Sequence, residues 1–515
     1  MYLKMADLLS ALPVELVSII GHTSAPSDLA ALLLANKTLN EHLTPTLYAS
    51  VDIQHYNHAQ FCIRTLSAEP STLAFGRDLA ALVRFFSLRY AYSIYSKPPG
   101  VAELARRLSR AVGRMTGLQH FTLAATATCT TDVCAALARS AAPTLRSLTI
   151  TADSQSRWAY GSDVGVLRDV RTVFPELTSV SLVLSKEAQW LDFFERILTP
   201  RAGHLRHLSF KVGSAPLLLS LVRNTPSWAQ LQELELDVPN VPLANLPSTP
   251  NVRKLTLSSP KTSDTLAQLV LPPDAFSALE VLACPYQFLP TFLPEDAQPQ
   301  RPIRTVRLNN ACYDEVDGIG DFPLHEPYPR WEELLEVLCC LPRSAGPVTD
   351  LSFYVDWFDA SVFGADLAPY TATLERLVVM LHEDLGGESA IATFGETLFA
   401  HTPKLHTFLL SDGPMRADDF KTIFRGDPEW LEEWDKHPNA LKNVAFTTGE
   451  GVWTKTDDGW QAPPRNEDSD DEGDDDEDED EDEDEEDEDE DDDEDDDDDD
   501  DDAVESDGSV VGESN

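Results

Sequence analysis

Twelve short segments of the chain share one order of residues, hydrophobic-x-x-hydrophobic-x-hydrophobic, in which x is most often polar. The last part of each segment alternates hydrophobic and polar positions, as a short β-strand with one buried face does. We therefore predict twelve strands, in segments that begin at Leu118, Leu145, Leu177, Leu205, Leu231, Val252, Leu279, Ile303, Val348, Leu374, Leu405 and Leu441. Two earlier matches, "YASVDI" from Tyr48 and "VRFFSL" from Val83, indicate that the series starts closer to the amino terminus.

The segments between these strands carry hydrophobic residues at helical spacing, as in Phe193, Phe194, Ile197 and Leu198. A proline lies one to six residues before ten of the twelve strands, where it would end the helix. One strand and one helix in roughly 20 to 30 residues resembles a leucine-rich-repeat solenoid, whose units bury their hydrophobic sides against each other. Because the family's Asn or Cys after the strand is mostly absent, we expect an α/β fold with an irregular solenoid over residues 54–447. The alternative is a helical repeat of the HEAT type, but such units lack alternating segments of this kind.

The segment that follows the last predicted strand has the pattern of a terminal cap. "VAFTTGEGVWTKTDDGWQ" alternates hydrophobic and polar residues around turn residues, with a hairpin turn expected at Asp457, Asp458 and Gly459. An exposed end of a solenoid has to be covered for solubility, and Trp453 and Trp460 are available to cover it. We expect this cap over residues 448–466.

The amino-terminal stretch "LPVELVSII" predicts a short helix. Pro13 suits its first turn, where the missing N–H is not needed, and Leu16, Ile19 and Ile20 then lie on one side. A second helix is expected after an N-cap at Ser27, through "DLAALLLANKTL", which is hydrophobic almost all round. One neighbouring helix cannot cover all of this surface, so part of it needs a partner or the first repeat.

Residues 10–53 resemble the F-box, as found in fungal proteins that continue into degenerate leucine-rich repeats. Leu12, Pro13, Glu15 and Leu16 match the family's opening Leu-Pro-x-Glu-Leu, and "DLAAL" and "NKTL" match its second helix and the residues after it. The resemblance implies a substrate-recognition subunit of an SCF-type ubiquitin ligase, which binds a Skp-type adaptor, and through it a cullin, while the repeats bind a protein substrate. It also implies that the adaptor is contacted by Leu12, Pro13, Leu16, Ile20, Leu29 and Leu32. The alternative is a helical cap of the repeat array that binds no partner.

The carboxyl-terminal part of the chain is almost entirely acidic. Residues 467–502 contain 34 Asp or Glu in 36 positions, whereas the whole chain has a formal net charge of −50. We expect residues 467–515 to be a disordered tail, because like charges repel and no hydrophobic surface offsets the chain entropy. Such a tail disfavours nucleic acid and favours basic partners. Acidic leucine-rich nuclear phosphoproteins are similar, so the alternative function is binding of histones or other basic proteins, with no role in ubiquitin transfer.

Basic residues recur at the polar positions of the predicted strands, which face away from the core on the concave side of such an array. We predict that the densest group binds substrate, and that it takes an acidic or phosphorylated segment, the chain's own tail included. This group consists of Arg206, Arg253, Lys254, Arg304 and Arg307. The alternative is a set of scattered, solvated charges.

The sequence contains no motif that predicts catalysis, a cofactor or a metal centre, so we expect a non-catalytic subunit without cofactors. The seven cysteines are odd in number and irregularly spaced, which favours a reducing compartment. No signal peptide opens the sequence and no run approaches the roughly 18 apolar residues of a membrane span. We expect a cytoplasmic or nuclear protein that is monomeric outside its complex and has no contact with membranes.

Overall fold

The computed structural model describes residues 14–461. The gaps in this range are 36, 73–76, 91–99, 125–130, 153–173, 185–187, 212–214, 225–226, 238–245, 247–248, 259–270, 272–274, 296–299, 309–328, 357–359, 382–392, 413–430, 432–433, 437–439, 447–452 and 458. Contacts divide the chain into two units, residues 1–464 and 465–515, and every described residue belongs to the first.

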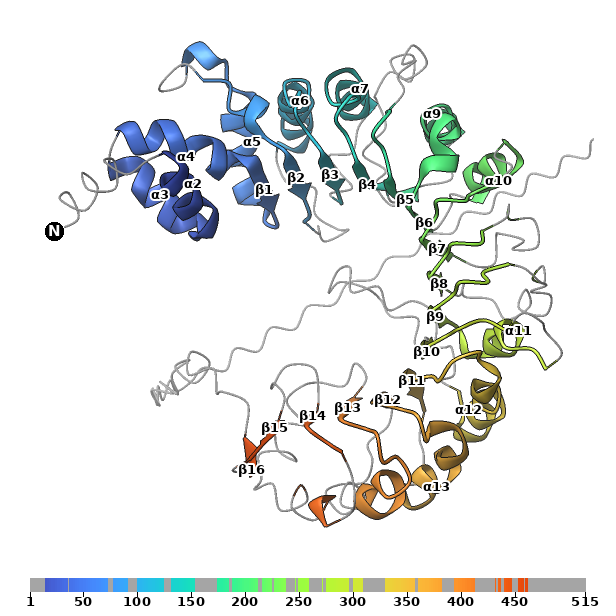
Figure 1. Ribbon diagram of the computed structural model, residues 1–515. Coiled ribbons are helices and arrows are strands. Elements are labelled where there is room, and N and C mark those ends of the chain that lie inside the picture. The colour runs from blue at the N-terminus through green and yellow to red at the C-terminus, as the bar shows by residue number, and fades with distance from the viewer. Residues whose placement is uncertain are drawn as a thin grey trace, which may run out of the picture. The chain divides into compact units, whose positions relative to one another are not determined.

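The first unit is built on one sheet of 16 strands that lie side by side in the order of the sequence (Figure 1). The strands are β1 (Ser50–Ile53), β2 (Phe85–Leu88), β3 (His120–Leu123), β4 (Ser147–Ala152), β5 (Ser179–Leu184), β6 (His207–Lys211), β7 (Glu233–Asp237), β8 (Lys254–Ser258), β9 (Val281–Cys284), β10 (Thr305–Leu308), β11 (Asp350–Val355), β12 (Arg376–Leu381), β13 (Thr407–Asp412), β14 (Asn443–Phe446), β15 (Trp453–Thr456) and β16 (Gly459–Gln461). Neighbours from β1 to β14 pair in parallel, and the last two pairings are antiparallel. All twelve predicted strands are confirmed as β3 to β14, and both earlier matches are strands as well.

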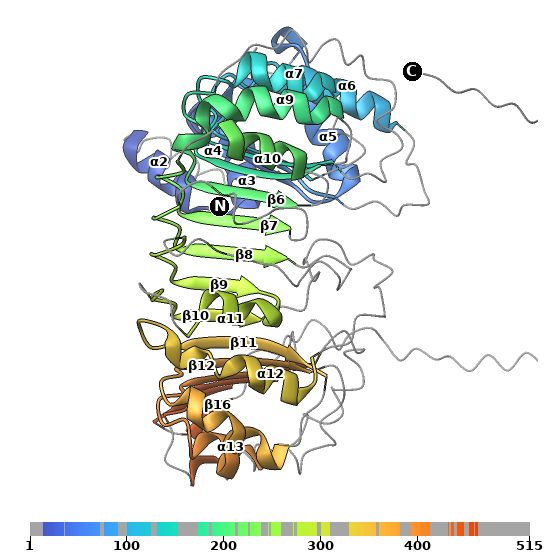
Figure 2. The same cartoon turned by 90° about the vertical axis from the view of Figure 1, so that its right-hand side faces the viewer.

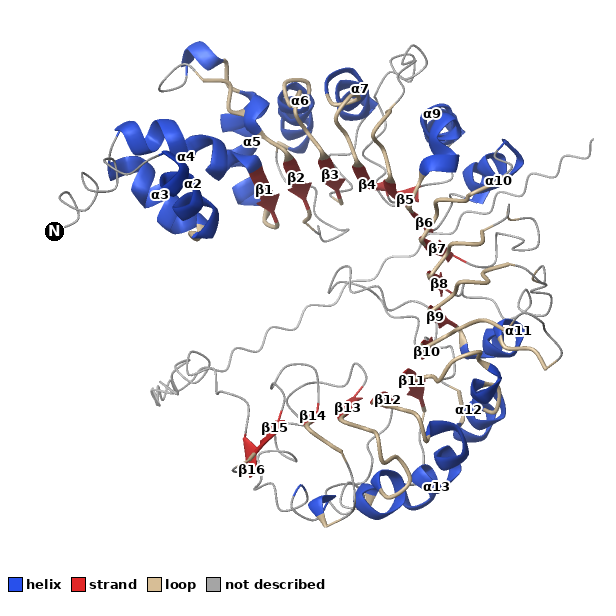
Figure 3. Ribbon diagram, in the orientation of Figure 1, coloured by secondary structure: helices blue, strands red, loops and turns tan. Residues whose placement is uncertain are grey.

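Helices connect many of the parallel strands and lie along one side of the sheet (Figures 2 and 3). The longer ones are α5 (Tyr56–Ser67), α6 (Val101–Val112), α7 (Thr131–Ser140), α9 (Ala188–Leu198), α10 (Ala215–Asn224), α12 (Trp331–Leu338) and α13 (Ala360–Thr371). Shorter helical turns are η1 (Pro70–Thr72), η3 (Ala80–Leu82), η5 (Thr199–His204), η8 (Tyr286–Phe288), α11 (Leu289–Phe292), η9 (Leu341–Arg343) and η10 (Gly395–Phe399). The helices differ in length from repeat to repeat, and this arrangement confirms the predicted α/β fold, an irregular solenoid of the leucine-rich-repeat type. Among the described helices, none has both the length and the apolar character that crossing a bilayer requires.

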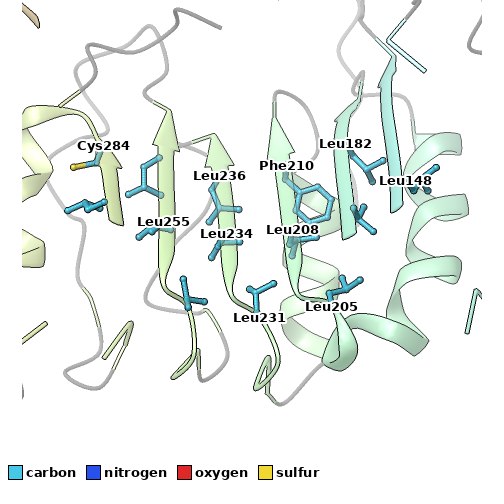
Figure 4. Packing of buried hydrophobic residues seen from close by; sticks show 14 of the residues in the cluster. Leu148, Leu182, Leu205, Leu208, Phe210, Leu231, Leu234, Leu236, Leu255 and Cys284 are labelled. Atoms are coloured by element: carbon cyan, nitrogen blue, oxygen red, sulfur yellow. The ribbon is translucent and has the colours of Figure 1, made fainter. Parts of the chain in front are cut away.

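The hydrophobic positions of the repeated segment build a continuous core between the sheet and the helices. Within one repeat Leu231, Leu234 and Leu236 are all buried, and Leu205, Leu208 and Phe210 of the preceding repeat stack beside them (Figure 4). Full burial of such a side chain contributes about 1.5–3 kcal/mol. Each repeat therefore depends on its neighbours for stability, as the pattern predicts.

A backbone ladder fixes where each strand begins relative to the previous one. The carbonyl oxygen of the residue just before a strand accepts two N–H groups from the next repeat, as when Thr178 accepts from Arg206 at 2.8 Å and His207 at 3.1 Å. The same pair of bonds recurs from Arg84 to Lys442 wherever one parallel strand follows another. The residue before each strand thus occupies an equivalent place in every repeat.

The amino-terminal helices differ from the prediction. The expected second helix is divided into α3 (Pro26–Ala35) and α4 (Lys37–Ala49), and α4 continues through Pro45 up to the residue before β1. Proline at this position cannot donate to the carbonyl of Glu41, but the Arg77 Nη1 atom donates to that oxygen instead, at 2.9 Å. Burial of Leu39 and Leu43 holds the helix in place on its other side.

Replacing Arg77 with alanine should therefore loosen α4. We expect a loss of about 1 kcal/mol, because the Glu41 carbonyl loses its donor and Pro45 cannot replace it. Hydrogen exchange measured on residues 37–49 should accelerate in Arg77→Ala and change less in Arg77→Lys, which keeps a donor. Unchanged exchange in the alanine variant would show that α4 does not need this bond.

The carboxyl-terminal strands form the expected hairpin. β15 pairs with β14 and β16 in antiparallel fashion, and Gly459 adopts a φ of +113°, which a side chain would disfavour. Trp453 and Trp460 pack against the core as predicted, and the Trp460 Nε1 atom donates to Asp435 at 3.2 Å. The hairpin thereby covers the last parallel strand.

Candidate interaction surfaces

The three amino-terminal helices, α2 (Val14–Thr23), α3 and α4, form a small bundle with a core of its own. This core contains Val17, Leu29, Leu39 and Leu43, and it is separate from the core of the repeats. A Cβ atom on Gly21 would lie 2.7 Å from the Leu43 Cδ2 atom, so the glycine permits α2 and α4 to approach closely. The bundle directly precedes β1, which places it at the amino-terminal end of the sheet (Figure 1).

The bundle leaves part of its hydrophobic surface uncovered. Leu16 and Ile19 on α2 are 46% and 59% exposed, and Leu34 on α3 is 89% exposed. Within the described part of the chain only two other large hydrophobic side chains are exposed, Phe61 and Phe85. Single exposed hydrophobic residues are common on proteins, but the small bundle carries three of them, two on α2 and one on α3, and leaves them open to a partner.

The residues predicted to contact an adaptor do not all lie on this surface. Leu16 does, and Ile20 and Leu32 are half-buried. Leu29 does not, because it is only 4% exposed and forms part of the small core, so the prediction of a partner contact there is corrected. Leu12 and Pro13 lie outside the described residues.

Two exposed residues of the bundle, Ile19 and Leu34, are not among those predicted to contact an adaptor. Ile19 lies three positions after Leu16, which places both on the same side of α2. The sequence of α3 does not show which of its leucines is exposed, because leucines occur on almost every side of this helix. In the structure Leu29, Leu32 and Leu33 pack toward the small core, and Leu34 does not. Only the packing of α3 against its neighbours identifies the one that is left outside.

The five basic residues predicted to bind substrate are all exposed. Arg206, Arg253 and Arg304 each stand immediately before a strand, whereas Lys254 and Arg307 lie within β8 and β10. Lys254 is partly neutralised by Glu233, whose carboxylate lies 3.6 Å from the Lys254 Nζ atom and 3.0 Å from the His207 Nδ1 atom. Among the described residues no acidic side chain forms an ion pair with any of the four arginines. The structure therefore spreads these residues over alternate strands instead of gathering them into one pocket.

The described residues form no metal centre. In this part of the chain no three His, Cys, Asp or Glu side chains are arranged to hold a metal ion. Its cysteines are free thiols: Cys62, Cys134, Cys284, Cys339 and Cys340. Burial raises the pKa of the Cys62 thiol to about 11, so little of it is the reactive thiolate at neutral pH.

A comparison with models of known protein families finds no match, and a comparison with curated proteins finds none either. Among solved structures, a chain of the yeast complex of Rad7 and Elc1 aligns at 14% identity over 80% of this chain and 96% of its own length, with a TM-score of 0.37. The leucine-rich repeat-containing protein LegL7 of Legionella pneumophila aligns at 16% identity over 58% of this chain and 89% of its own length, with a TM-score of 0.28. These scores are low, and the fold described above stands on the strand order and register.

Proposed function

We propose that this protein is the substrate-recognition subunit of an SCF-type ubiquitin ligase. In this proposal the amino-terminal bundle binds a Skp-type adaptor, and through it a cullin, while the repeats bind the protein to be ubiquitinated. The observation that carries the proposal is the exposed group of Leu16, Ile19 and Leu34 on a bundle whose sequence resembles the F-box.

The physical basis of adaptor binding is burial of this hydrophobic surface. A helical bundle with its own small core can present side chains without disturbing the repeats behind it. Burying one Leu or Ile side chain contributes about 1.5–3 kcal/mol, so three of them offset a substantial part of the entropy lost on association. Helices that place such side chains in a groove of the partner are a common mode of recognition.

The repeats suit a role in recognition because they form a stacked scaffold with one face free of described helices. Binding residues on such a scaffold keep fixed distances from one another, since the backbone ladder sets the register of every strand. The proposal assigns no catalytic step to this chain, and ubiquitin transfer takes place on other subunits.

The test of adaptor binding uses the full-length protein and a purified Skp-type adaptor. Replacing both Leu16 and Ile19 with aspartate should weaken binding at least 100-fold, because it places two charges in the proposed interface. Phe61→Asp is the matched control, since Phe61 is 69% exposed on α5, outside the bundle, and its substitution should leave affinity unchanged. Both side chains of the double variant are exposed, so circular dichroism should show an unchanged fold. Equal affinity of the wild type and the double variant would exclude this binding mode.

A second function is favoured by a separate observation, the 34 acidic residues between positions 467 and 502. A run of this charge density attracts basic proteins such as histones by long-range electrostatics. Co-purification from cells separates the two functions. Recovery of an adaptor and a cullin supports the ligase subunit, whereas recovery of histones without them supports a protein that binds basic partners.

A further inference from the structure

The residue that stands immediately before each strand is an arginine in every second repeat over the first part of the sheet. Read from β2 to β10, this position is occupied in turn by Arg84, Gln119, Arg146, Thr178, Arg206, Gln232, Arg253, Glu280 and Arg304. The alternation stops after β10, where the same position holds Thr349, Glu375, His406 and Lys442. We call the five arginines the arginine row.

The backbone ladder places the members of the arginine row at equal intervals. Arg146 O accepts from Thr178 N at 2.9 Å and Thr178 O accepts from Arg206 N at 2.8 Å, so the two arginines are separated by one intervening strand. The same pair of steps links Arg206 to Arg253 and Arg253 to Arg304. Adjacent strands lie about 4.8 Å apart, which gives a repeat of about 9.6 Å along the row.

The side chains of the row are exposed and available to a ligand. Arg84 is partly engaged, because its Nη1 atom donates to the Gly117 carbonyl at 3.1 Å. The other four make no ion pair with any side chain in the described part of the chain, although Glu280 occupies the position between Arg253 and Arg304. Glu233, one position further into the sheet, is already paired with Lys254.

We infer that the arginine row binds an extended acidic peptide of a partner protein, with a carboxylate at every third residue. A polyproline II chain has three residues per turn and rises about 3.1 Å per residue, so residues i and i+3 lie on the same side about 9.3 Å apart. This interval matches the row. A β-strand does not match it, because residues on the same side repeat at about 6.6 Å and residue i+3 points the other way.

The positions between the arginines of the row argue against a dense polyanion. Between successive arginines stand three uncharged residues, Gln119, Thr178 and Gln232, and one acidic residue, Glu280, so none of these positions adds a positive charge. A nucleic acid strand carries a charge about every 3.4 Å and would place most of its phosphates against these residues. In a peptide with a carboxylate at every third residue, each carboxylate lies opposite an arginine. The uncharged residues of the peptide then lie opposite the positions between the arginines.

This inference does not depend on the proposed role in ubiquitin transfer, because the row lies on the sheet and the adaptor surface lies on the amino-terminal bundle. The experiment therefore contains no adaptor. Fluorescence anisotropy of the full-length protein would compare two labelled peptides of about 13 residues with five glutamates each. One peptide has glutamate at every third position and proline elsewhere, and the other has the same residues with the glutamates consecutive.

We expect the spaced peptide to bind at least threefold more tightly, and its affinity to fall as salt is raised from about 0.05 M to 0.5 M. Each of Arg146→Gln, Arg206→Gln and Arg253→Gln should weaken binding about two- to fivefold, and the triple variant more than tenfold. Arg110→Gln, the same change of charge on α6, should have no effect and serves as the control.

Three results would overturn the inference. Equal affinity for the two peptides would show that binding does not depend on a match between the spacing of the carboxylates and that of the arginines. Equal weakening by Arg110→Gln would show attraction by overall charge alone. Tighter binding of the consecutive peptide, or of a single-stranded oligonucleotide, would show a site for dense polyanions instead.

Discussion

Replacing Gly364 with alanine should unfold or severely loosen the part of the solenoid around α13. Gly364 lies in this helix against η10, and a Cβ atom at this position would overlap the backbone of Thr397 and Leu398. Backbone atoms cannot move aside as the end of a flexible side chain can, so the two segments must separate. Overpacking of this kind lowers the free energy of unfolding by about 1–3 kcal/mol. Because the overlap here is with backbone atoms, we expect a loss at or above the upper end of this range.

The measurement is urea unfolding followed by circular dichroism, with Gly346→Ala as the matched control. No atom lies within 4 Å of a Cβ at Gly346, so this alanine should change the free energy of unfolding by less than about 0.5 kcal/mol. If both variants unfold at the same urea concentration as the wild type, α13 and η10 do not approach each other as closely as described.

Replacing Trp434 with alanine should have the other large effect on stability. Trp434 is fully buried, and its ring centroid lies 4.7 Å from that of Phe399 and 6.3 Å from that of Phe408. Removal of a buried tryptophan costs about 3–5 kcal/mol, because the neighbouring rings do not collapse into the cavity. Since each repeat depends on its neighbours, the loss should concentrate in the last parallel strands.

Hydrogen exchange followed by mass spectrometry locates this effect. Protection should fall in β12 to β14 of Trp434→Ala and remain unchanged in β3 to β6 at the other end of the sheet. Trp434→Phe keeps an aromatic ring in the cluster and should lose less than half as much stability. A uniform loss of protection along the whole chain would contradict the nearest-neighbour dependence of the repeats.

The strands of this protein could be predicted from its amino-acid sequence alone. Hydrophobic and polar residues alternate within each segment, and this alternation predicts a strand with one buried face. The prediction needs only the geometry of neighbouring residues. For the same reason the hairpin was predictable, because Asp457, Asp458 and Gly459 are turn residues in any context. The exposure of Arg206, Arg253 and Arg304 was expected because each occupies the first polar position of the repeated segment.

Features that depend on residues distant in the sequence became apparent only from the three-dimensional packing. Pro45 remains inside α4 because Arg77, 32 positions later, supplies the missing donor. Leu29 is buried in the small core while Leu34 is exposed, because α3 packs against α4 with one side only. The arginine row also required the structure, since its members are unevenly spaced along the chain and become equidistant only when the backbone ladder sets one position per strand. The local pattern thus determines which residues form a strand, because alternation needs only neighbouring residues. Packing and register determine which side chains remain exposed, because they depend on contacts between segments far apart in the sequence.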